Sequence, residues 1–485
     1  MTSAYDQVRY PTFAKTATHP ARLGALGVLL GRRVSAPARC RVLEIGCGDG
    51  MNLLSMAATA TESRFVGFDY CAPAIAEGLA TARAAGIRNV ELVEKNILDA
   101  TPGLGNFDYI IAHGVYAWVP APVRDAVMAL IGRHLAPDGL AFLSYNTVPG
   151  CHVRRIVRDL LQDAVRGIAG AQAQIAAARD ALEFFAAQWT SPDPLLSALR
   201  RQAEETLKHD PAVLFHDELG DVYEPQLVSD VAAHAAANGL QYLCDARPRV
   251  NMDAFFPREE SRPLFERAGG DWVRFEQLRD YAALQGFRET ILCRADGPVA
   301  RRAEPARLRM LHAVGEFSRA ATDAAGAEEC VYLGANDIRT TTTDPRLAAL
   351  LERIDAAYPG SIPLENEDVE GDVGESLLLL HLAGSLELLA QPLPCLQTPG
   401  ARPQASALAR VQAGRGDRLL CSLRHTPVEI TDAMGLHFIT LLDGSRTREE
   451  LAAAMAAAAG QPVAAAAERL QAGLQGFCRA ALLTA

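Results

Sequence analysis

A glycine-rich turn between an apolar run and a helical stretch is the most constraining feature of this sequence. Residues 41–45 form a short aliphatic run, Gly46, Gly48 and Gly50 follow at alternate positions, and residues 51–60 have a helical pattern. Glycine tolerates positive φ and lets the backbone approach a ligand closely. The helix behind the glycines offers unpaired N–H groups and a partial positive charge to an anion. The pattern predicts the first strand, turn and helix of an α/β sheet that binds a nucleotide-type cofactor.

Apolar runs and helical stretches continue to alternate after this turn. Strands are predicted over residues 65–68, 90–93, 108–112 and 140–144, and helices over 73–85 and 123–135, the last ended by the turn Pro137-Asp138-Gly139. Such alternation is typical of a parallel sheet covered by helices on both faces. Two later strand candidates, 240–243 and 287–293, are expected to complete the sheet. The predicted fold class is α/β, a doubly wound, mostly parallel, seven-stranded Rossmann-like sheet.

The length of 485 residues allows several domains, each with its own core. We expect six parts: an N-terminal cap segment with an apolar helix at 22–30 (1–37), the cofactor-binding core (38–150), an Ala-rich helical insertion (151–235), the last strands of the core (236–297), a middle domain (298–395) and a C-terminal winged-helix-like domain of helical or mixed structure (396–485).

Composition excludes several classes of protein. The chain has 47 Lys and Arg against 58 Asp and Glu, a formal net charge of −11, whereas non-specific binding to nucleic acid or anionic lipid needs clustered basic residues. No apolar stretch is long enough to span a membrane and the N-terminus has no signal pattern, so we expect a cytoplasmic location. The ten cysteines are scattered without a C-x-x-C pair. We therefore expect buried thiols and no metal site.

The spacing of the glycines narrows the choice of cofactor. A dinucleotide fingerprint reads G-x-G-x-x-G, but here the third glycine, Gly50, comes one residue early. Glu44, two residues before Gly46, would repel a pyrophosphate and would suit a cationic ligand. Asp69, at the end of the next strand, is placed to accept hydrogen bonds from ribose hydroxyls. NAD is the alternative cofactor, and a purely structural turn is the alternative without a ligand.

Glu44, the three glycines and Asp69 together resemble the cofactor loop of class I S-adenosylmethionine-dependent methyltransferases. The resemblance implies S-adenosyl-L-methionine as the cofactor, which carries a sulfonium, an ammonium and a carboxylate. It also implies that adenine is bound beside Asn96, a position at which the family has Asn or Asp. Residues 113–118 are expected to line the methyl-transfer site. The implied cofactor-binding residues are Glu44, Gly46, Cys47, Gly48, Gly50, Asn52, Asp69, Tyr70, Asn96, Ile97 and His113.

A narrower resemblance is carried by several short motifs. They are YD at 5–6, THP at 18–20, SYNTVPG at 144–150, FHDEL at 215–219, GLQYL at 239–243, FRETILCR at 287–294 and LLDGSRTR at 441–448. These are similar to the methyltransferases that carry a methyltransferase regulatory domain, a family that includes rickettsial protein-lysine methyltransferases. The resemblance implies a lysine-containing protein as the substrate, and it leaves a homodimer open.

The loop after the fourth strand lacks the [D/N]-P-P-[Y/F] motif of enzymes that methylate adenine N6 or glutamine. Methyl transfer to an amine needs an in-line, deprotonated nucleophile and requires no metal. The candidates to orient or deprotonate the acceptor are Tyr5, His113, Tyr116, Trp118, and Tyr145 with its neighbour Asn146. For each of them, packing or capping alone is the alternative.

The C-terminal region has helix–turn–helix spacing. The turn Asp443-Gly444 is followed by Thr447 and Glu450 at the spacing of a capping box. The helix that follows begins with acidic residues and has no basic ones, which argues against a DNA-reading helix. We expect a small winged-helix-like module for protein contacts or substrate docking, with a simple packing bundle as the alternative.

These features predict an S-adenosylmethionine-dependent methyltransferase that acts on a protein side chain, with the lysine ε-amine as the leading acceptor. The large non-catalytic part of the chain favours a macromolecular acceptor, because a small one does not need it. A small-molecule N- or O-methyltransferase and a non-catalytic cofactor-binding regulatory protein are the alternatives.

Overall fold

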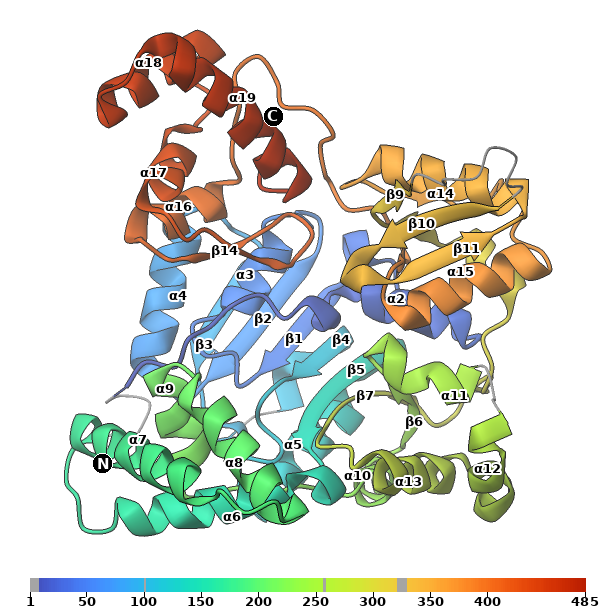
Figure 1. Cartoon of the computed structure of the whole chain (residues 1–485). Coiled ribbons are helices and arrows are strands. Elements are labelled where there is room, and N and C mark those ends of the chain that lie inside the picture. Colours follow the sequence, from blue (N-terminus) through green and yellow to red (C-terminus); the bar gives the residue numbers. More distant parts are fainter. Residues whose placement is uncertain (1–7, 100–101, 256–258, 321–328) are drawn as a thin grey trace.

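A seven-stranded sheet forms the centre of the computed structural model, which describes residues 8–99, 102–255, 259–320 and 329–485 (Figure 1). Its strands are β1 (Arg41–Ile45), β2 (Arg64–Asp69), β3 (Val90–Glu94), β4 (Phe107–Ala112), β5 (Leu135–Asn146), β6 (Leu240–Asp245) and β7 (Phe287–Arg294). Their order is β3-β2-β1-β4-β5-β7-β6, and only β7 runs antiparallel to its neighbours. The predicted mostly parallel, seven-stranded fold is confirmed, including the place of the two late strands.

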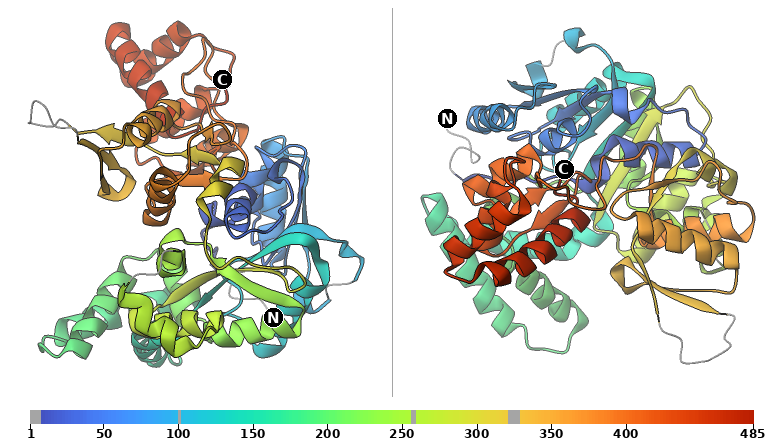
Figure 2. Two further views of the ribbon diagram at one scale, coloured as in Figure 1. Left: turned by 90° about the vertical axis from the view of Figure 1, so that its right-hand side faces the viewer. Right: turned by 90° about the horizontal axis from the view of Figure 1, so that it is seen from above.

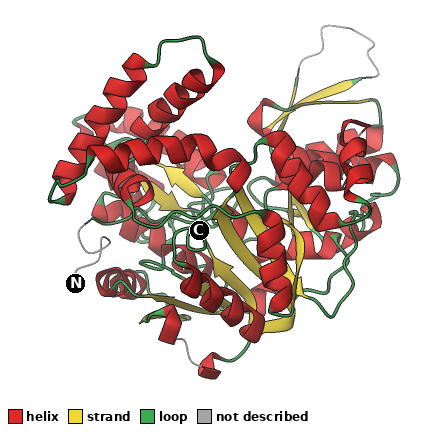
Figure 3. Ribbon diagram, turned by 90° about the horizontal axis from the view of Figure 1, so that it is seen from below, coloured by secondary structure: helices red, strands yellow, loops and turns green. Residues whose placement is uncertain are grey.

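Helices cover both faces of the sheet, as the view from below shows (Figure 3). The covering helices are α2 (Pro20–Leu29), α3 (Met51–Ala57), α4 (Ala72–Ala84), α5 (Ala121–His134) and α10 (Val228–Ala237). Val42 packs on the side of α2 and α3, whereas its neighbour Leu43 packs on the side of α5 and α10. Successive strand residues point to opposite faces, so the apolar run of β1 is buried on both sides.

The predicted turn before the fifth strand is built into the strand itself. β5 begins at Leu135, but its pairing with β4 jumps from Phe107 opposite Leu135 to Tyr109 opposite Leu140. Residues 136–139, which include the predicted turn, therefore bulge out of the ladder. A bulge keeps the later pairs of β5 in register while it accommodates the extra residues.

The helical insertion follows β5 and forms one lobe beside the core, green in Figures 1 and 2. It contains α6 (Val148–Ala164), α7 (Ala171–Gln188), α8 (Pro194–Leu207), α9 (Pro211–Val213) and the single π-helical turn η5 (Leu214–Glu218). Val157, Leu182 and Leu199 share its small core. Helix α10, which we expected inside the insertion, instead packs through Val231 and Ala235 on the sheet, because its apolar face belongs to the core.

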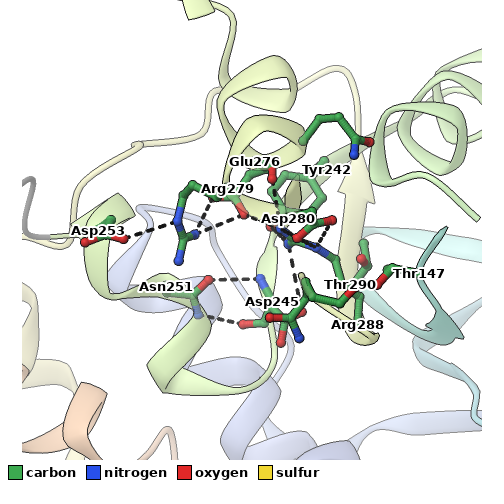
Figure 4. Close-up of polar contacts among 12 residues, drawn as sticks. Thr147, Tyr242, Asp245, Asn251, Asp253, Glu276, Arg279, Asp280, Arg288 and Thr290 are labelled. Carbon is green, nitrogen blue, oxygen red and sulfur yellow. Dashed lines mark hydrogen bonds and ion pairs between the residues drawn. The ribbon is translucent and has the colours of Figure 1, made fainter. Parts of the chain in front are cut away.

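An ionic cluster ties the last two strands to α13 (Trp272–Ala283) and, through Arg279 and Asp253, to α11 (Met252–Phe255). Helix α12 (Arg262–Ala268) lies between these two helices in the chain. Figure 4 shows Arg288 of β7, fully buried, at the centre of the cluster. Arg288 donates hydrogen bonds to Asp280 (2.7 Å) and Glu276 (2.8 Å) and to the Tyr242 hydroxyl (3.1 Å). Buried charges need such partners, so the cluster fixes α13 against β6 and β7.

In its described residues the middle domain has two small sheets and two α-helices. Its elements are β8 (His312–Val314), β9 (Phe317–Arg319), β10 (Cys330–Gly334), β11 (Arg339–Thr342), α14 (Pro345–Ala357), β12 (Ile362–Pro363), α15 (Asp372–Ala383) and β13 (Glu387–Leu389). The sheet orders are β11-β10-β9 and β12-β8-β13. Ala25 and Leu29 of α2 enter the core of this domain, so α2 joins it to the central sheet.

The C-terminal domain combines four helices with a β-hairpin. They are α16 (Ala407–Arg415), β14 (Leu419–Cys421), β15 (Pro427–Glu429), α17 (Ala433–Leu441), α18 (Arg448–Ala459) and α19 (Val463–Arg479). Both bonds of the predicted capping box, between Thr447 and Glu450, are present at the start of α18. In Figure 1 this domain (red) lies over α3 and α4 at the edge of the central sheet.

Within the described ranges, every helix is too short or too polar to cross a membrane. Eight of the ten cysteines are buried as expected, and Cys330 and Cys395 are half-buried.

Candidate active site

A cavity of about 1090 Å³ opens at the carboxyl ends of the parallel strands, the edge at which open α/β sheets bind ligands. One part of it, the cofactor half, is lined by Glu44, Gly46, Gly48, Asp69 and Asn96. The other part, the acceptor half, lies toward the helical insertion and is lined by Trp118, Asn146, Gly150, Arg154, Asp217 and Phe287. Both halves are open to the same space, so a ligand in one can reach a ligand in the other.

The glycine turn has the backbone that the sequence predicted. Gly46, Gly48 and Gly50 have φ of +69°, +57° and +71°, values that a residue with a side chain rarely adopts. A Cβ on Gly46 would lie 2.7 Å from Val115 Cγ2, so the turn and the loop after β4 approach each other closely. Gly46 and Gly48 line the cavity, whereas Gly50 lies behind them against Leu92.

Glu44 is buried at the floor of the cofactor half. Its Oε1 accepts a hydrogen bond of 2.9 Å from Asn52, the second residue of α3, and its Oε2 is buried without a partner among the described residues. Burial raises the pKa of Glu44 to about 8, and the Asn52 bond and the charge of Lys15 act against that shift. A buried acid with an orphan oxygen is suited to a cationic ligand group such as an ammonium.

Asp69 occupies the end of β2, as predicted. Its two carboxylate oxygens accept hydrogen bonds of 2.9 Å from the N–H groups of Gly48 and Cys71. Burial raises the pKa of Asp69, and these backbone bonds oppose the shift. The carboxylate is thereby held at the cavity wall with lone pairs left for a pair of ligand hydroxyls.

The cofactor-binding candidate Tyr70 and the residues proposed for the adenine, Asn96 and Ile97, also line the cavity. Tyr70 is exposed and Asn96 and Ile97 follow the end of β3. The Asn96 side-chain oxygen accepts a hydrogen bond of 3.0 Å from the N–H of Leu98, which fixes the orientation of the amide. Cys47 and Asn52 complete the set of predicted cofactor residues that line the cavity.

A segment of residues 9–18, which we call the N-terminal strap, closes one side of the cavity. Thr12 donates a hydrogen bond of 2.6 Å to Asp49 of the glycine turn, and Lys15 lines the cavity. The Lys15 ammonium lies 3.7 Å from the centroid of the Phe13 ring, and among the described residues no carboxylate oxygen forms an ion pair with it. Burial lowers the pKa of Lys15, although Glu44 and Asp217 favour its charge.

Sequence reasoning missed Lys15. A signal was present, because the chain has only the lysines 15, 95 and 208, and both Lys15 and Lys95 line this cavity. Nothing local to Lys15 points to the cavity, however, since the strap reaches it only through long-range contacts.

Two of the catalytic candidates line the cavity. His113 stacks on Phe142, with ring centroids 6.0 Å apart, and burial lowers its pKa to about 3, so its ring is neutral near pH 7. Trp118 contacts Tyr223 at 5.0 Å between centroids and the guanidinium of Arg154 at 5.3 Å. Trp118 therefore forms a rigid aromatic wall of the acceptor half.

Two other catalytic candidates point away from the cavity, and we correct the expectation for both. The Tyr116 hydroxyl is bonded to His234 Nδ1 at 2.6 Å, and the Tyr145 hydroxyl to Thr290 Oγ1 at 2.8 Å. Both rings are almost fully buried, and burial raises the pKa of each hydroxyl. Neither hydroxyl lines the cavity, so neither is in reach of an acceptor there. Tyr5, the remaining candidate, lies outside the described residues.

The acceptor half contains Asn146, which the sequence offered as the neighbour of Tyr145, and Asp217, which it did not single out as a site residue. Asn146, at the end of β5, is buried, and its Oδ1 has no hydrogen-bond partner among the described residues. Asp217 accepts a hydrogen bond from Tyr10 and lies 3.6 Å from Arg154, and burial raises its pKa. The floor is formed by Gly150, where a Cβ would lie 2.3 Å from a backbone oxygen of Leu284.

The two halves fit S-adenosylmethionine and an acceptor. Glu44 and Asp69 match an ammonium and a ribose, Lys15 matches a carboxylate, and the glycine turn leaves room for the backbone to approach. Within the described ranges no group of three or more His, Cys, Asp or Glu side chains is arranged to hold a metal ion.

Comparisons with known families agree with this organisation. Residues 42–139 match a methyltransferase domain, residues 210–294 match a predicted methyltransferase regulatory domain, and residues 401–482 match the C-terminal winged-helix domain of PKMT proteins. The last match confirms the expected winged helix.

Two curated relatives come from Rickettsia prowazekii. The uncharacterized protein RP789 is 32% identical over 293 residues, which are 60% of this chain and 53% of that protein. The uncharacterized protein RP028 is 33% identical over 220 residues, 45% of this chain and 88% of that protein. The chain thus spans about half the length of the first relative and most of the second.

The solved structure of PKMT2 from Rickettsia typhi is similar to this chain, with a TM-score of 0.85 and 25% sequence identity. The match covers 98% of this chain and 100% of that one. The complex of that protein with AdoHcy has the same TM-score at 24% identity. The matched domains, the relatives and the cofactor residues that line the cavity all indicate the same family. The chain belongs to the S-adenosylmethionine-dependent methyltransferases that carry a methyltransferase regulatory domain and a PKMT-type winged-helix domain.

Proposed function

We propose that this protein transfers the methyl group of S-adenosylmethionine to the ε-amine of a lysine in another protein. The observation that carries the proposal is one cavity in which the cofactor half continues into an acceptor half. The acceptor half has aromatic walls and the side-chain oxygen of Asn146, which has no hydrogen-bond partner among the described residues. When bound, the cofactor supplies an electrophilic methyl group on a sulfonium. The residues of the chain must then hold an amine in line with it.

Asn146 is suited to hold the amine. Its Oδ1 is a buried acceptor, and an N–H of the incoming nitrogen would satisfy it while leaving the nitrogen lone pair free to point elsewhere. The ring of Trp118 lines the same half and offers an apolar surface to the methylene chain of a lysine. This pairing of one carbonyl with an aromatic wall favours a primary amine on an alkyl chain.

The amine must be neutral when it reacts, and two residues assist its deprotonation. The positive charge of Lys15, which lies between the two halves, favours loss of a proton from a neighbouring ammonium. Asp217 supplies a carboxylate to the acceptor half, and its raised pKa makes that carboxylate a stronger base for accepting the proton. The neutral ring of His113 shapes the loop between them.

A protein is favoured over a small molecule by the lobe beside the site. The acceptor half is bordered by α6 and η5 of the insertion, through Arg154 and Asp217, so an acceptor approaches along the surface of a separate lobe. The PKMT name of the similar rickettsial structure supports the same acceptor class.

The test is incubation of the purified protein with methyl-labelled S-adenosylmethionine and a lysate of the cell that makes it. Base-stable label in the acid-precipitated protein, recovered as methyl-lysine and absent with Asp69→Ala, is the expected result. Label confined to soluble metabolites would establish a small-molecule acceptor instead. A protein that binds AdoHcy but labels no fraction would be a cofactor-binding regulator.

A further inference from the structure

The β14–β15 hairpin of the C-terminal domain inserts its turn between the N-terminal strap and helix α3. Leu408 of α16 and Cys421 of β14 pack with Ala14 of the strap and with Met51 and Leu54 of α3. The winged-helix domain therefore contacts the segment that closes the cofactor half.

His425, in the turn of this hairpin, is the polar centre of the contact. It is 1% exposed and has a φ of +57°, an uncommon backbone conformation for a residue with a side chain. Its Nδ1 lies 2.9 Å from Ser55 Oγ of α3, and its Nε2 lies 3.5 Å from Thr18 Oγ1 of the strap. The ring is also hydrogen-bonded to the backbone of Lys15.

From these contacts, a chain of hydrogen bonds leads to Glu44. Thr18 is hydrogen-bonded to Asn52, the N–H of Lys15 donates to Asn52 Oδ1 at 2.8 Å, and Asn52 Nδ2 donates to Glu44 at 2.9 Å. Asn52 thus holds both the Glu44 carboxyl group, which matches an ammonium, and the backbone of Lys15, whose side chain matches a carboxylate. Thr18, the strap residue whose side chain is bonded to Asn52, is in turn contacted by His425.

A second set of contacts docks the same domain independently of His425. Arg415 of α16 is hydrogen-bonded to Thr81 and lies 3.4 Å from Glu77, both in α4. Arg424, next to His425, pairs with Glu387 of β13, which also pairs with Arg22 of α2. Loss of the His425 side chain alone should therefore leave the domain docked.

We propose that His425 is a positioning residue of the cofactor site, through which the docked winged-helix domain holds Lys15 and Asn52 beside Glu44. The consequence is linkage: a cofactor that needs this arrangement binds more tightly when the hairpin is docked, and its binding must strengthen the docking by the same factor. The inference depends on cofactor binding and not on the acceptor, so it stands or falls separately from the proposed lysine substrate.

Calorimetric titration of the full-length protein with AdoHcy tests the proposal without turnover. His425→Ala should raise the Kd for AdoHcy about tenfold or more, since a contact to a positioned group is lost. His425→Asn should recover part of the affinity, because Asn tolerates positive φ and can reach Ser55. The matched control is His437→Ala, an exposed histidine of α17 in the same domain, which should bind as the wild type does.

Hydrogen–deuterium exchange of the wild-type protein gives a second readout that does not depend on any variant folding. Saturating AdoHcy should slow exchange in residues 419–429 of the hairpin as well as in residues 44–52 of the cofactor loop. A hairpin that serves only as a structural contact would not respond. Unchanged exchange at 419–429, or wild-type affinity in a folded His425→Ala protein, would overturn the proposal.

Discussion

Asn52 bridges the glycine turn by donating a hydrogen bond of 2.9 Å to Glu44, and it leaves the second oxygen of Glu44 buried without a partner among the described residues. The bond joins the end of β1, before the turn, to the start of α3, after the turn. It holds the carboxyl group at the cavity, where a ligand can satisfy the second oxygen. The cofactor half is therefore organised before a cofactor arrives, and its energetics should depend on the charge of Glu44.

The free energy of unfolding should fall as the pH rises from about 5 to about 8. Burial raises the pKa of Glu44 to about 8 in the folded protein, from an ordinary value of 4.5, so the folded state binds more protons than the unfolded state in this window. The free energy of unfolding should fall by as much as ~1.4 kcal/mol for each pH unit. Glu44→Gln should remove this component. Melting temperatures of both proteins without cofactor, measured from pH 5 to pH 8, check it, and parallel profiles would contradict it.

Asp69→Ala should abolish most cofactor affinity. The substitution removes a carboxylate that accepts the Gly48 and Cys71 N–H groups and leaves lone pairs for the ribose. Loss of hydrogen bonds to a charged group costs roughly 1.5–3 kcal/mol each, so the Kd for AdoHcy should rise at least about tenfold. Calorimetry measures the change. Glu62→Ala removes an exposed carboxylate that pairs with Arg39 on the surface; it is the control and should bind AdoHcy normally.

Trp118→Ala should impair the acceptor and spare the cofactor. Trp118 lines the acceptor half, where it contacts Tyr223 and Arg154. We expect kcat/KM for the acceptor protein to fall about tenfold or more, while the Kd for AdoHcy stays within about twofold. Tyr281→Ala removes an exposed aromatic ring outside the cavity and serves as the control. Equal losses in acceptor and AdoHcy binding would place Trp118 in the cofactor half instead.

Arg288→Met should destabilise the protein strongly. The buried guanidinium neutralises Asp280 and Glu276 (Figure 4). Its removal leaves the buried Asp280 carboxylate without its cation, while Glu276 keeps only its pair with Arg279 among the described residues. Removal of one member of a buried ion pair costs about 3–5 kcal/mol. The surface pair of Arg262 and Glu266 is the comparison, since Arg262→Ala should cost less than about 1 kcal/mol. Urea denaturation followed by circular dichroism distinguishes the two.

The fold of the core and most of the cofactor half were predictable from the sequence, because they depend on local patterns. The alternation of apolar runs with helices predicted the parallel strands, and the positive φ of Gly46, Gly48 and Gly50 follows from the residue type itself. Asp69 could be located because the end of a strand is readable from its apolar pattern. These features need only a few neighbouring residues to be specified.

Side-chain direction on β5 was decided by the tertiary structure. Tyr145 and Asn146 are adjacent in sequence, and neighbouring residues of a strand point to opposite faces. Tyr145 is turned to Thr290 of β7, whereas Asn146 lines the cavity. The sequence alone does not say which face of β5 borders the cavity, since both residues are buried.

The sequence by itself determined the alternation of strands and helices in the core's first half, the glycine turn and the cofactor class, because each depends on short-range spacing and residue type. Only the tertiary structure brought Lys15 beside Glu44 and His425 against Thr18. His425 and Thr18 are separated by hundreds of residues in the sequence. Contacts of this kind depend on how whole domains pack. No local pattern encodes them, because the surfaces that meet are formed only after each domain has folded.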